Sequence, residues 1–139
     1  MKIYFAGSIR GGRILVDTYK RIVEFLKQEG HQVLTEYVAD PSIGPAGEKK
    51  SESYMFEKDF ELLKEADLII ADISITSIGV GWEIGYAQAI GKTIICLYNV
   101  NSEKIMTPMI AGNPDVKIIR YTTVRDVKEK IKNELTKLK

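Results

Sequence analysis

The sequence has little of what a disulfide scaffold, a zinc site or a nucleic-acid binder needs. Its 139 residues include one cysteine and one histidine, and 20 Lys and Arg residues are balanced by 19 Asp and Glu residues, giving a net charge of +1. One cysteine cannot form an internal disulfide, and no Cys/His cluster is present to bind zinc or another metal. The charge balance argues against nucleic-acid and polybasic membrane binding, and no apolar run reaches the roughly 18 residues of a membrane span. We expect a cytoplasmic protein with no nucleic-acid or membrane partner.

What is present is an ordinary globular composition, with 45 % hydrophobic and 28 % charged residues. A chain of this length is expected to form one domain, residues 1–139, and to bury roughly two thirds of the surface that it exposes when unfolded. The apolar run at the N-terminus is too short for a secretory signal and leads directly into an expected strand.

Short apolar runs alternate with longer helical patterns along the chain. Strands are expected at residues 2–6, 32–35, 67–73, 93–98 and 116–121, and helices at 13–29, 53–65, 79–90 and 123–138, with a short one near 107–111. This alternation predicts an α/β fold of three layers, a doubly wound five-stranded parallel sheet of the Rossmann or flavodoxin type. Ligands bind beyond the carboxyl ends of such strands, where residues 7–12, 74–83 and 99–112 are expected.

The first of these segments is glycine-rich and reads Gly7-Ser8-Ile9-Arg10-Gly11-Gly12. Glycines after a first strand allow backbone N–H groups to point at an anion, and the Ser8 hydroxyl and the planar Arg10 guanidinium suit a phosphate. The segment lacks the Gly-Lys-Ser/Thr ending of a Walker loop and the spacing of a dinucleotide loop. It therefore indicates either a phosphate site of another kind or a plain turn with a solvated arginine.

The second segment opens a helix with Gly79-Val80-Gly81-Trp82-Glu83-Ile84-Gly85, whose glycine spacing disfavours NAD binding. On that helix Glu83 shares a face with Val80 and Ala87, so its side chain is expected to point toward the sheet. A carboxylate there is costly unless it is hydrogen-bonded or functional. The alternative role is favourable placement near the N-terminus of a helix.

A second acid, Asp59, lies between Phe56 and Leu63 on the apolar stripe of the helix expected at residues 53–65. An acid in that position suits a general acid, or it is a rim residue paired with a Lys or Arg. Two carboxylates that flank one pocket are the minimum apparatus for breaking a glycosidic bond. Tyr4, in the middle of the first strand, either orients one of them from the floor of the pocket or is an ordinary core aromatic.

The run Tyr4-Phe5-Ala6-Gly7-Ser8-Ile9-Arg10-Gly11-Gly12 resembles the opening of the 2'-deoxynucleoside 5'-phosphate N-hydrolases, which belong to the nucleoside 2-deoxyribosyltransferase superfamily. The similarity continues through Ser77-Ile78-Gly79-Val80-Gly81-Trp82-Glu83-Ile84-Gly85. Shorter stretches support it at residues 34–36, 57–59, 66–67, 96–97 and 109–112, so it covers about residues 2–121 in consistent order. The resemblance implies a single nucleoside deoxyribosyltransferase-like domain.

The resemblance also implies an activity, the splitting of a deoxynucleoside 5'-monophosphate into a free base and 2-deoxyribose 5-phosphate without a metal or other cofactor. By position, Glu83 matches the nucleophile that forms a glycosyl-enzyme ester. Asp59 matches the acid that assists departure of the base, and Tyr4 matches the tyrosine that positions the nucleophile.

Further positions match substrate contacts of this family, and one of them matches a contact across a dimer. Family members are homodimers in which a hydroxyl of one subunit completes the phosphate site of the other. Thr107 stands where that serine usually lies, and Tyr37 stands where relatives have a histidine. The substrate contacts that the resemblance implies are Gly7, Ser8, Ile9, Arg10, Gly11, Tyr37, Ser77, Gly79, Thr107 and Met109.

Two other functions remain open at this point. A nucleoside 2-deoxyribosyltransferase would pass the sugar from the same covalent intermediate to a second base instead of water. A nucleotide-binding module would use the sheet as a platform without catalysis. The Ser8-Ile9-Arg10 run favours phosphate recognition over a transferase of free nucleosides, and two inward acids argue against a binding module.

Overall fold

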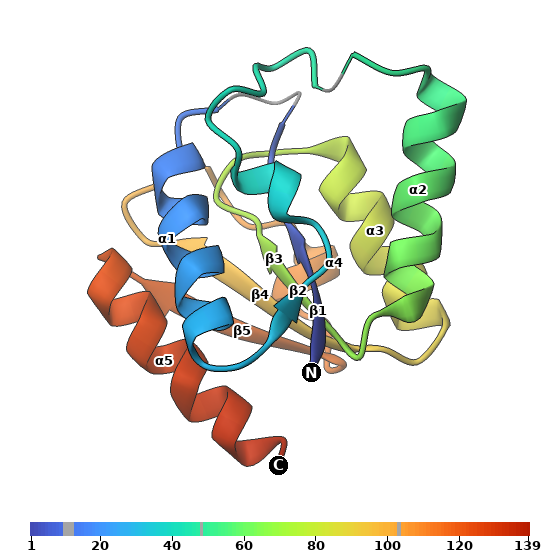
Figure 1. Cartoon of the computed structure of the whole chain (residues 1–139). Helices are drawn as coiled ribbons and strands as arrows, with labels where there is room; N and C mark the ends of the chain where they lie inside the picture. Colours follow the sequence, from blue (N-terminus) through green and yellow to red (C-terminus); the bar gives the residue numbers. More distant parts are fainter. Residues whose placement is uncertain (10–12, 48, 103) are drawn as a thin grey trace.

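The fold centres on a sheet of five parallel strands in the order β2-β1-β3-β4-β5 (Figure 1). The computed structural model describes residues 1–9, 13–47, 49–102 and 104–139. The strands are β1 (Lys2–Ala6), β2 (Gln32–Val33), β3 (Leu68–Asp72), β4 (Thr93–Asn99) and β5 (Val116–Tyr121). Every residue of β3 is buried, as expected for a central parallel strand that is covered on both faces.

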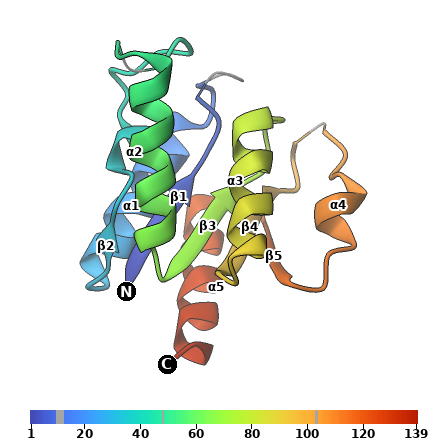
Figure 2. The same ribbon diagram turned by 90° about the vertical axis from the view of Figure 1, so that its right-hand side faces the viewer.

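Helices cover both faces of this sheet, which confirms the predicted three-layer α/β fold. They are α1 (Val16–Gln28), α2 (Glu52–Glu65), α3 (Ile78–Ala89), α4 (Pro108–Ala111) and α5 (Val124–Lys137), with a 3-10 helix, η1 (Glu36–Ala39), after β2. Helices α1 and α5 pack on one face, and α2 and α3 lie side by side on the other (Figure 2). None of the helices in the part of the chain that the structure describes is long and apolar enough to cross a membrane.

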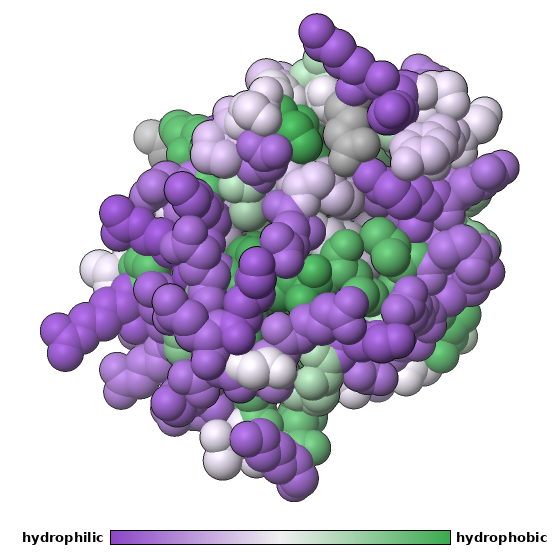
Figure 3. Space-filling model, in the orientation of Figure 1, coloured by the Kyte–Doolittle hydropathy of each residue, from purple (hydrophilic) through white to green (hydrophobic). Residues whose placement is uncertain are grey.

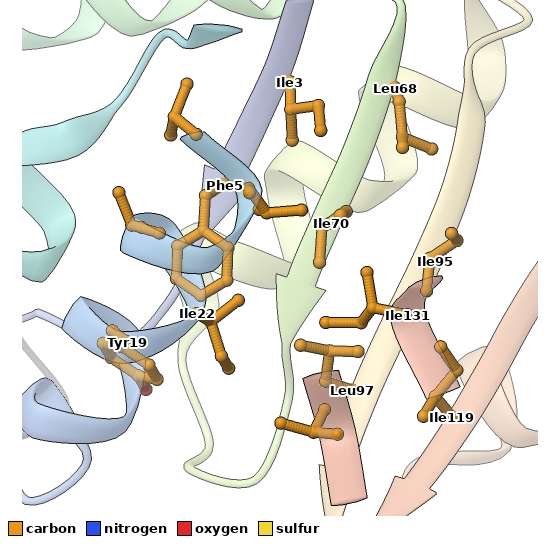
Figure 4. Close-up of a cluster of buried hydrophobic side chains, with 14 of the residues drawn as sticks. Ile3, Phe5, Tyr19, Ile22, Leu68, Ile70, Ile95, Leu97, Ile119 and Ile131 are labelled. Atoms are coloured by element: carbon orange, nitrogen blue, oxygen red, sulfur yellow. The ribbon is translucent and has the colours of Figure 1, made fainter. Parts of the chain in front are cut away.

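The two faces of the sheet carry side chains of different size. Large aliphatic and aromatic residues fill the α1/α5 face, among them Ile3, Phe5, Tyr19, Ile22, Ile70, Leu97 and Ile131 (Figure 4). The α2/α3 face carries Tyr4, Ile69 and Ile94 and, toward the carboxyl ends of the central strands, the small residues Ala6, Ala71 and Cys96. Ala6 and Ala71 pair across the last register position of β1 and β3. Short side chains at this edge take up little of the space between the sheet and its helices.

Helix α2 is attached to this face less firmly than α1 is to the other. Leu63 is the buried residue of α2, whereas α1 buries Tyr19, Ile22, Val23 and Leu26. Phe56, which the sequence predicts on the inner face of α2, does not pack on the sheet: it is 54 % exposed and lines an open cavity between α2 and α3. Its ring stacks on Phe60 of the same helix, 5.4 Å between centroids, and so finds an apolar contact without reaching the sheet.

Two predicted boundaries differ from the structure for identifiable reasons. The strand predicted at 32–35 ends at Val33, because the Thr35 hydroxyl accepts a hydrogen bond from the Phe5 amide (2.9 Å) and donates one to the Phe5 carbonyl (2.6 Å). Those bonds take the place of ladder bonds. The helix predicted from residue 13 begins at Val16, and the Arg13 side chain is bonded to carbonyl groups of two other segments.

The order in which strands are added to the sheet changes side between β1 and β3. From β1 the chain passes outward to β2, and from β3 it passes the other way to β4 and β5. The loops that follow β1 and β3 therefore diverge and leave a crevice at the carboxyl ends of these strands, the usual ligand position in such folds. The surface seen from the side of Figure 1 is mainly hydrophilic, with hydrophobic residues showing in the middle of the face (Figure 3).

Candidate active site

Two adjoining cavities open at the crevice between β1 and β3, and they share Asp59, Gly79 and Glu83. The first, of about 200 Å³, is lined mainly by loop residues and by one side of α2. The second, of about 330 Å³, is lined by Tyr4 and by apolar residues of α2 and α3. The two acids singled out in the sequence therefore lie at the boundary between a cavity of mixed lining and an aromatic one.

Glu83 is placed by the first two turns of α3. Ser77 caps this helix by accepting a hydrogen bond from the Val80 amide (3.3 Å), which fixes where α3 starts. Burial raises the pKa of Glu83 to about 7; a hydrogen bond from the Tyr4 hydroxyl works in the opposite direction, and the neighbouring charge of Asp59 adds to the rise. Glu83 thus changes protonation near neutral pH.

Tyr4 lies beneath this carboxylate, as the sequence predicts. It is almost completely buried in the middle of β1. Burial, followed by the charge of Glu83, raises the pKa of its phenol far above the ordinary value. The hydroxyl therefore keeps its proton at neutral pH and donates it in a hydrogen bond to Glu83, which restricts the orientation of that carboxylate.

Asp59 lies on the α2 side of the cavities. The Tyr37 hydroxyl donates a hydrogen bond to Asp59 Oδ1. The Lys58 ammonium lies 4.0 Å from the centroid of the Tyr37 ring. Met55, one helical turn before Asp59, lines the first cavity together with Lys58 and Tyr37. The Tyr37 hydroxyl therefore contacts this acid directly, whereas Lys58 lies over the Tyr37 ring.

The expected phosphate-binding residues divide into three groups. Gly7, Ile9, Ser77 and Gly79 line the first cavity. The Ser8 side chain is instead fully buried, and its hydroxyl has no hydrogen-bond partner among the described residues. Arg10 and Gly11 lie outside the described residues.

Gly7 has a steric reason to be glycine. A Cβ atom there would lie 2.8 Å from the ring of Tyr19, a distance that real Cβ contacts do not show. The Tyr19 hydroxyl in turn accepts a hydrogen bond from the Ser8 amide (3.2 Å). The turn after β1 therefore rests directly on α1.

Thr107 and Met109 are not brought to the two carboxylates. Thr107 caps α4 by accepting a hydrogen bond from the Met109 amide (3.3 Å). It lines a separate cavity, which also contains Ser77 and Val80. The Met109 side chain is 78 % exposed. Within one copy of the chain, Thr107 and Met109 therefore lie at α4, outside the two cavities that contain Glu83 and Asp59.

Two residues of α2 that line the first cavity, Met55 and Lys58, were not predicted from the sequence. Met55 and Lys58 stand four residues and one residue before Asp59, and the helical period would have placed Met55 on the same face. The second cavity has an aromatic wall, Phe56, Phe60 and Trp82. Trp82 also stacks on Tyr86 at a centroid distance of 5.4 Å. Over the described ranges, no group of three or more His, Cys, Asp or Glu residues could hold a metal ion.

The raised pKa of Glu83 predicts a stability effect of Glu83→Gln. Because the folded-state pKa of about 7 exceeds the ordinary 4.5, Glu83 favours folding below about pH 4.5, and that contribution is lost as the pH rises through 7. Glutamine imitates the protonated form and accepts the Tyr4 hydroxyl. We expect it to raise the free energy of unfolding at about pH 8 by about 1–3 kcal/mol, with little change at about pH 4.5.

Urea unfolding of both proteins at the two pH values measures this difference. Glu61→Gln is the matched control, because Glu61 lies on the surface of α2 and pairs with Lys64. Equal stabilities of wild type and Glu83→Gln at both pH values would show that Glu83 is ordinarily solvated.

Comparison with known proteins finds relatives that match this chain over most of its length. The chain is 43 % identical over 115 residues to a mouse protein named 5-hydroxymethyl-dUMP N-hydrolase, covering 81 % of this chain and 66 % of the mouse protein, just under two thirds of its length. It is 40 % identical over 132 residues to the protein of the same name from Esox lucius, covering 93 % and 88 % of the two chains. A protein of Syntrophotalea carbinolica named "Putative 2'-deoxynucleoside 5'-phosphate N-hydrolase 1" is 38 % identical over 135 residues, covering 97 % and 94 %.

Solved structures share the fold at lower identity. A CMP N-glycosidase of Clostridium botulinum superposes with a TM-score of 0.69 at 23 % identity, covering 95 % of this chain and 99 % of that one. A 2-deoxyribosyltransferase of Bacillus psychrosaccharolyticus gives 0.64 at 22 %, covering 92 % and 90 %. The sequence model of the nucleoside 2-deoxyribosyltransferase family matches residues 3–133. This chain therefore belongs to the nucleoside 2-deoxyribosyltransferase family.

Proposed function

We propose that this protein hydrolyses the N-glycosidic bond of 2'-deoxynucleoside 5'-monophosphates to a free base and 2-deoxyribose 5-phosphate. The observation that carries the proposal is the convergence of Glu83 and Asp59 on one pair of cavities, each with a tyrosine hydroxyl bonded to it. The names of the mouse, Esox and Syntrophotalea relatives support the reaction and the substrate class.

In the first step the Glu83 carboxylate attacks C1' of the sugar and forms an ester. The C1'–N bond breaks, its electron pair stays with the base, and the base takes a proton from Asp59. Positive charge develops on the sugar on the way, and a carboxylate beside it stabilises that charge. A 2'-hydroxyl would withdraw electrons from this centre and crowd Glu83, so deoxy sugars are favoured.

In the second step water replaces the base. Asp59, now a carboxylate, takes a proton from the water as the water oxygen attacks C1', and the ester bond to Glu83 breaks. The enzyme returns to its starting protonation state, and 2-deoxyribose 5-phosphate leaves. Asp59 thus acts as general acid in the first step and as general base in the second, while Glu83 is the nucleophile and then the leaving group, as in retaining glycosidases.

The phosphate is proposed to bind at the far end of the first cavity, next to Gly7, Ile9, Ser77 and Gly79. The N-terminus of α3 lies there, and its unpaired N–H groups favour an anion. Arg10 belongs to the same proposal on sequence grounds. Gripping the phosphate holds C1' at a fixed place relative to Glu83.

The proposal extends to a cytoplasmic homodimer in which Thr107 of one copy completes the phosphate site of the other. The side chains that flank Thr107 support a surface covered by a second copy, since Ile105 is 97 % exposed and Met109 is 78 % exposed. Apolar side chains that are exposed close together in one segment are typical of a surface that another protein covers.

Product analysis tests the proposed reaction. The protein is incubated with deoxynucleoside monophosphates, including a 5-hydroxymethyl pyrimidine, with and without an added free base, and the products are separated by chromatography. We expect free base and 2-deoxyribose 5-phosphate in both cases. Because transfer from the same ester would give a new nucleotide only with added base, that result would favour a deoxyribosyltransferase. Binding without any product would favour a nucleotide-binding module.

A further inference from the structure

Each of the two acids of the site is bonded to a tyrosine, but the two tyrosines come from different parts of the fold. Tyr4, which serves Glu83, belongs to the central strand β1. Tyr37, which serves Asp59, belongs to η1, between β2 and the loop that leads to α2. The mechanism above gives Tyr37 no task, although it occupies one oxygen of the acid that must deliver a proton.

Asp59 needs an external anchor more than Glu83 does. Its helix, α2, buries Leu63, which stands a full turn beyond Asp59, and it follows a long loop. Glu83 in contrast lies between the buried residues Val80 and Ile84 of α3. A misplacement of about 1 Å of a catalytic group is enough to cost a large factor in rate. The position of Asp59 therefore depends on contacts other than the packing of α2.

The segment that carries Tyr37 is firmly held. On one side Thr35 is bonded to the backbone of Phe5 through two hydrogen bonds of 2.9 and 2.6 Å. On the other side the Arg13 guanidinium donates to the carbonyls of Val38 (2.7 Å) and Asp40 (3.0 Å) and to that of Ser8 (3.2 Å). Arg13 thus ties η1 to the turn after β1, and η1 is a rigid support for a hydroxyl.

The charge of Lys58 adds to this arrangement. Its ammonium lies 4.0 Å from the centroid of the Tyr37 ring, within the range of a cation–π contact. A cation over a phenol withdraws electron density from its oxygen and makes the hydroxyl a stronger hydrogen-bond donor. Lys58 and Asp59 are adjacent in α2, so this helix contacts Tyr37 twice: Lys58 contacts its ring and Asp59 accepts a hydrogen bond from its hydroxyl.

We propose that Tyr37 is the positioning residue of the general acid: its hydroxyl holds Asp59 Oδ1, so that the other carboxyl oxygen carries the proton toward the departing base. This inference rests on the proposed function. Tyr37 itself gives up no proton. It acts through Asp59, and its contribution to the first step exists only when the base must be protonated in order to leave.

The test is a double-mutant cycle of Tyr37→Phe and Asp59→Ala, read as kcat and KM on a deoxynucleoside monophosphate. Phenylalanine keeps the ring against Lys58 and removes the hydroxyl. We expect Tyr37→Phe to lower kcat by about tenfold or more, the worth of a hydrogen bond to a charged group, and to change KM by less than about threefold. In the Asp59→Ala background the same change should alter kcat by less than about twofold.

A second substrate separates positioning from a general loss of structure. The nitrophenolate of p-nitrophenyl 2-deoxyriboside 5-phosphate leaves without a proton, so Tyr37→Phe should release it in the first turnover, before water attacks the ester, at nearly the wild-type rate. Tyr54→Phe is the control, since the Tyr54 ring also faces Lys58, at 5.9 Å, and it should behave as wild type on both substrates. Thermal unfolding of each variant confirms that it is folded.

An unchanged kcat in Tyr37→Phe, or an equal loss with and without Asp59, would overturn the role of Tyr37 and leave the proposed function intact. An equal loss on both substrates would do the same. No turnover of either substrate by the wild-type protein would overturn the proposed function, and the role of Tyr37 with it.

Discussion

Replacing Glu83 with alanine is expected to abolish base release and to leave the fold intact. Glu83 is the proposed nucleophile, and removal of a nucleophile from a covalent mechanism costs roughly 10⁴-fold or more in kcat. Alanine is the best helix former, and the change removes a carboxylate that burial holds at a pKa of about 7, so α3 should remain folded. Chromatography of the released base measures the loss, and circular dichroism checks the helix content.

The matched control for this variant is Glu61→Ala, which removes a glutamate from the exposed side of α2, where it pairs with Lys64 at 2.7 Å. Its turnover should equal that of the wild type. Mass spectrometry of a slowed variant, Asp59→Ala, mixed rapidly with p-nitrophenyl 2-deoxyriboside 5-phosphate, whose leaving group needs no proton, should detect a deoxyribose phosphate adduct on the peptide that contains Glu83. Near-normal turnover of Glu83→Ala would remove this residue from the mechanism.

Removing the 5'-phosphate from the substrate is expected to lower kcat/KM by about 10³-fold or more, with a large part of the loss in kcat. The phosphate is remote from the bond that breaks, and its binding serves to hold C1' against Glu83. The measurement compares a deoxynucleoside with its 5'-monophosphate under the same conditions. A loss confined to KM would mean that the phosphate adds affinity alone.

Arg10 provides the corresponding variant of the protein. Arg10→Ala should weaken binding of the monophosphate strongly and binding of the nucleoside hardly at all. Arg21→Ala is its control, since Arg21 lies on the exposed side of α1 and pairs with Asp17 at 3.2 Å. Equal effects of Arg10→Ala on the two substrates would refute a phosphate role for that residue.

Local periodicity was enough to predict the layers of the fold and the acids of the site. The strand bounds 2–6 and 116–121 agree with β1 and β5, because each is an apolar run between turn residues. Glu83 and Asp59 could be singled out because each is an acid on an otherwise apolar helical stripe. A helical period identifies which residues share a face, whereas the distance between two inward-facing acids on different helices is set by how those helices pack.

What periodicity does not give is the depth to which a face is buried or a contact between distant segments. Phe56 shares the stripe of Leu63, yet α2 meets the sheet at Leu63 and leaves Phe56 at the surface. The Ser8 hydroxyl is buried because Tyr19 of α1 lies beneath the turn. The bond of Tyr37 to Asp59 joins residues that are 22 positions apart. These features depend on tertiary packing and have no local signal.

The location of the two chain ends has a practical consequence. Lys2 starts β1 and Lys137 ends α5, and both ends of the chain lie at the edge of the sheet opposite the loops that surround the cavities (Figure 1). An affinity tag, a fluorophore or a tether to a solid support can be fused at either terminus without obstructing the mouth of the crevice.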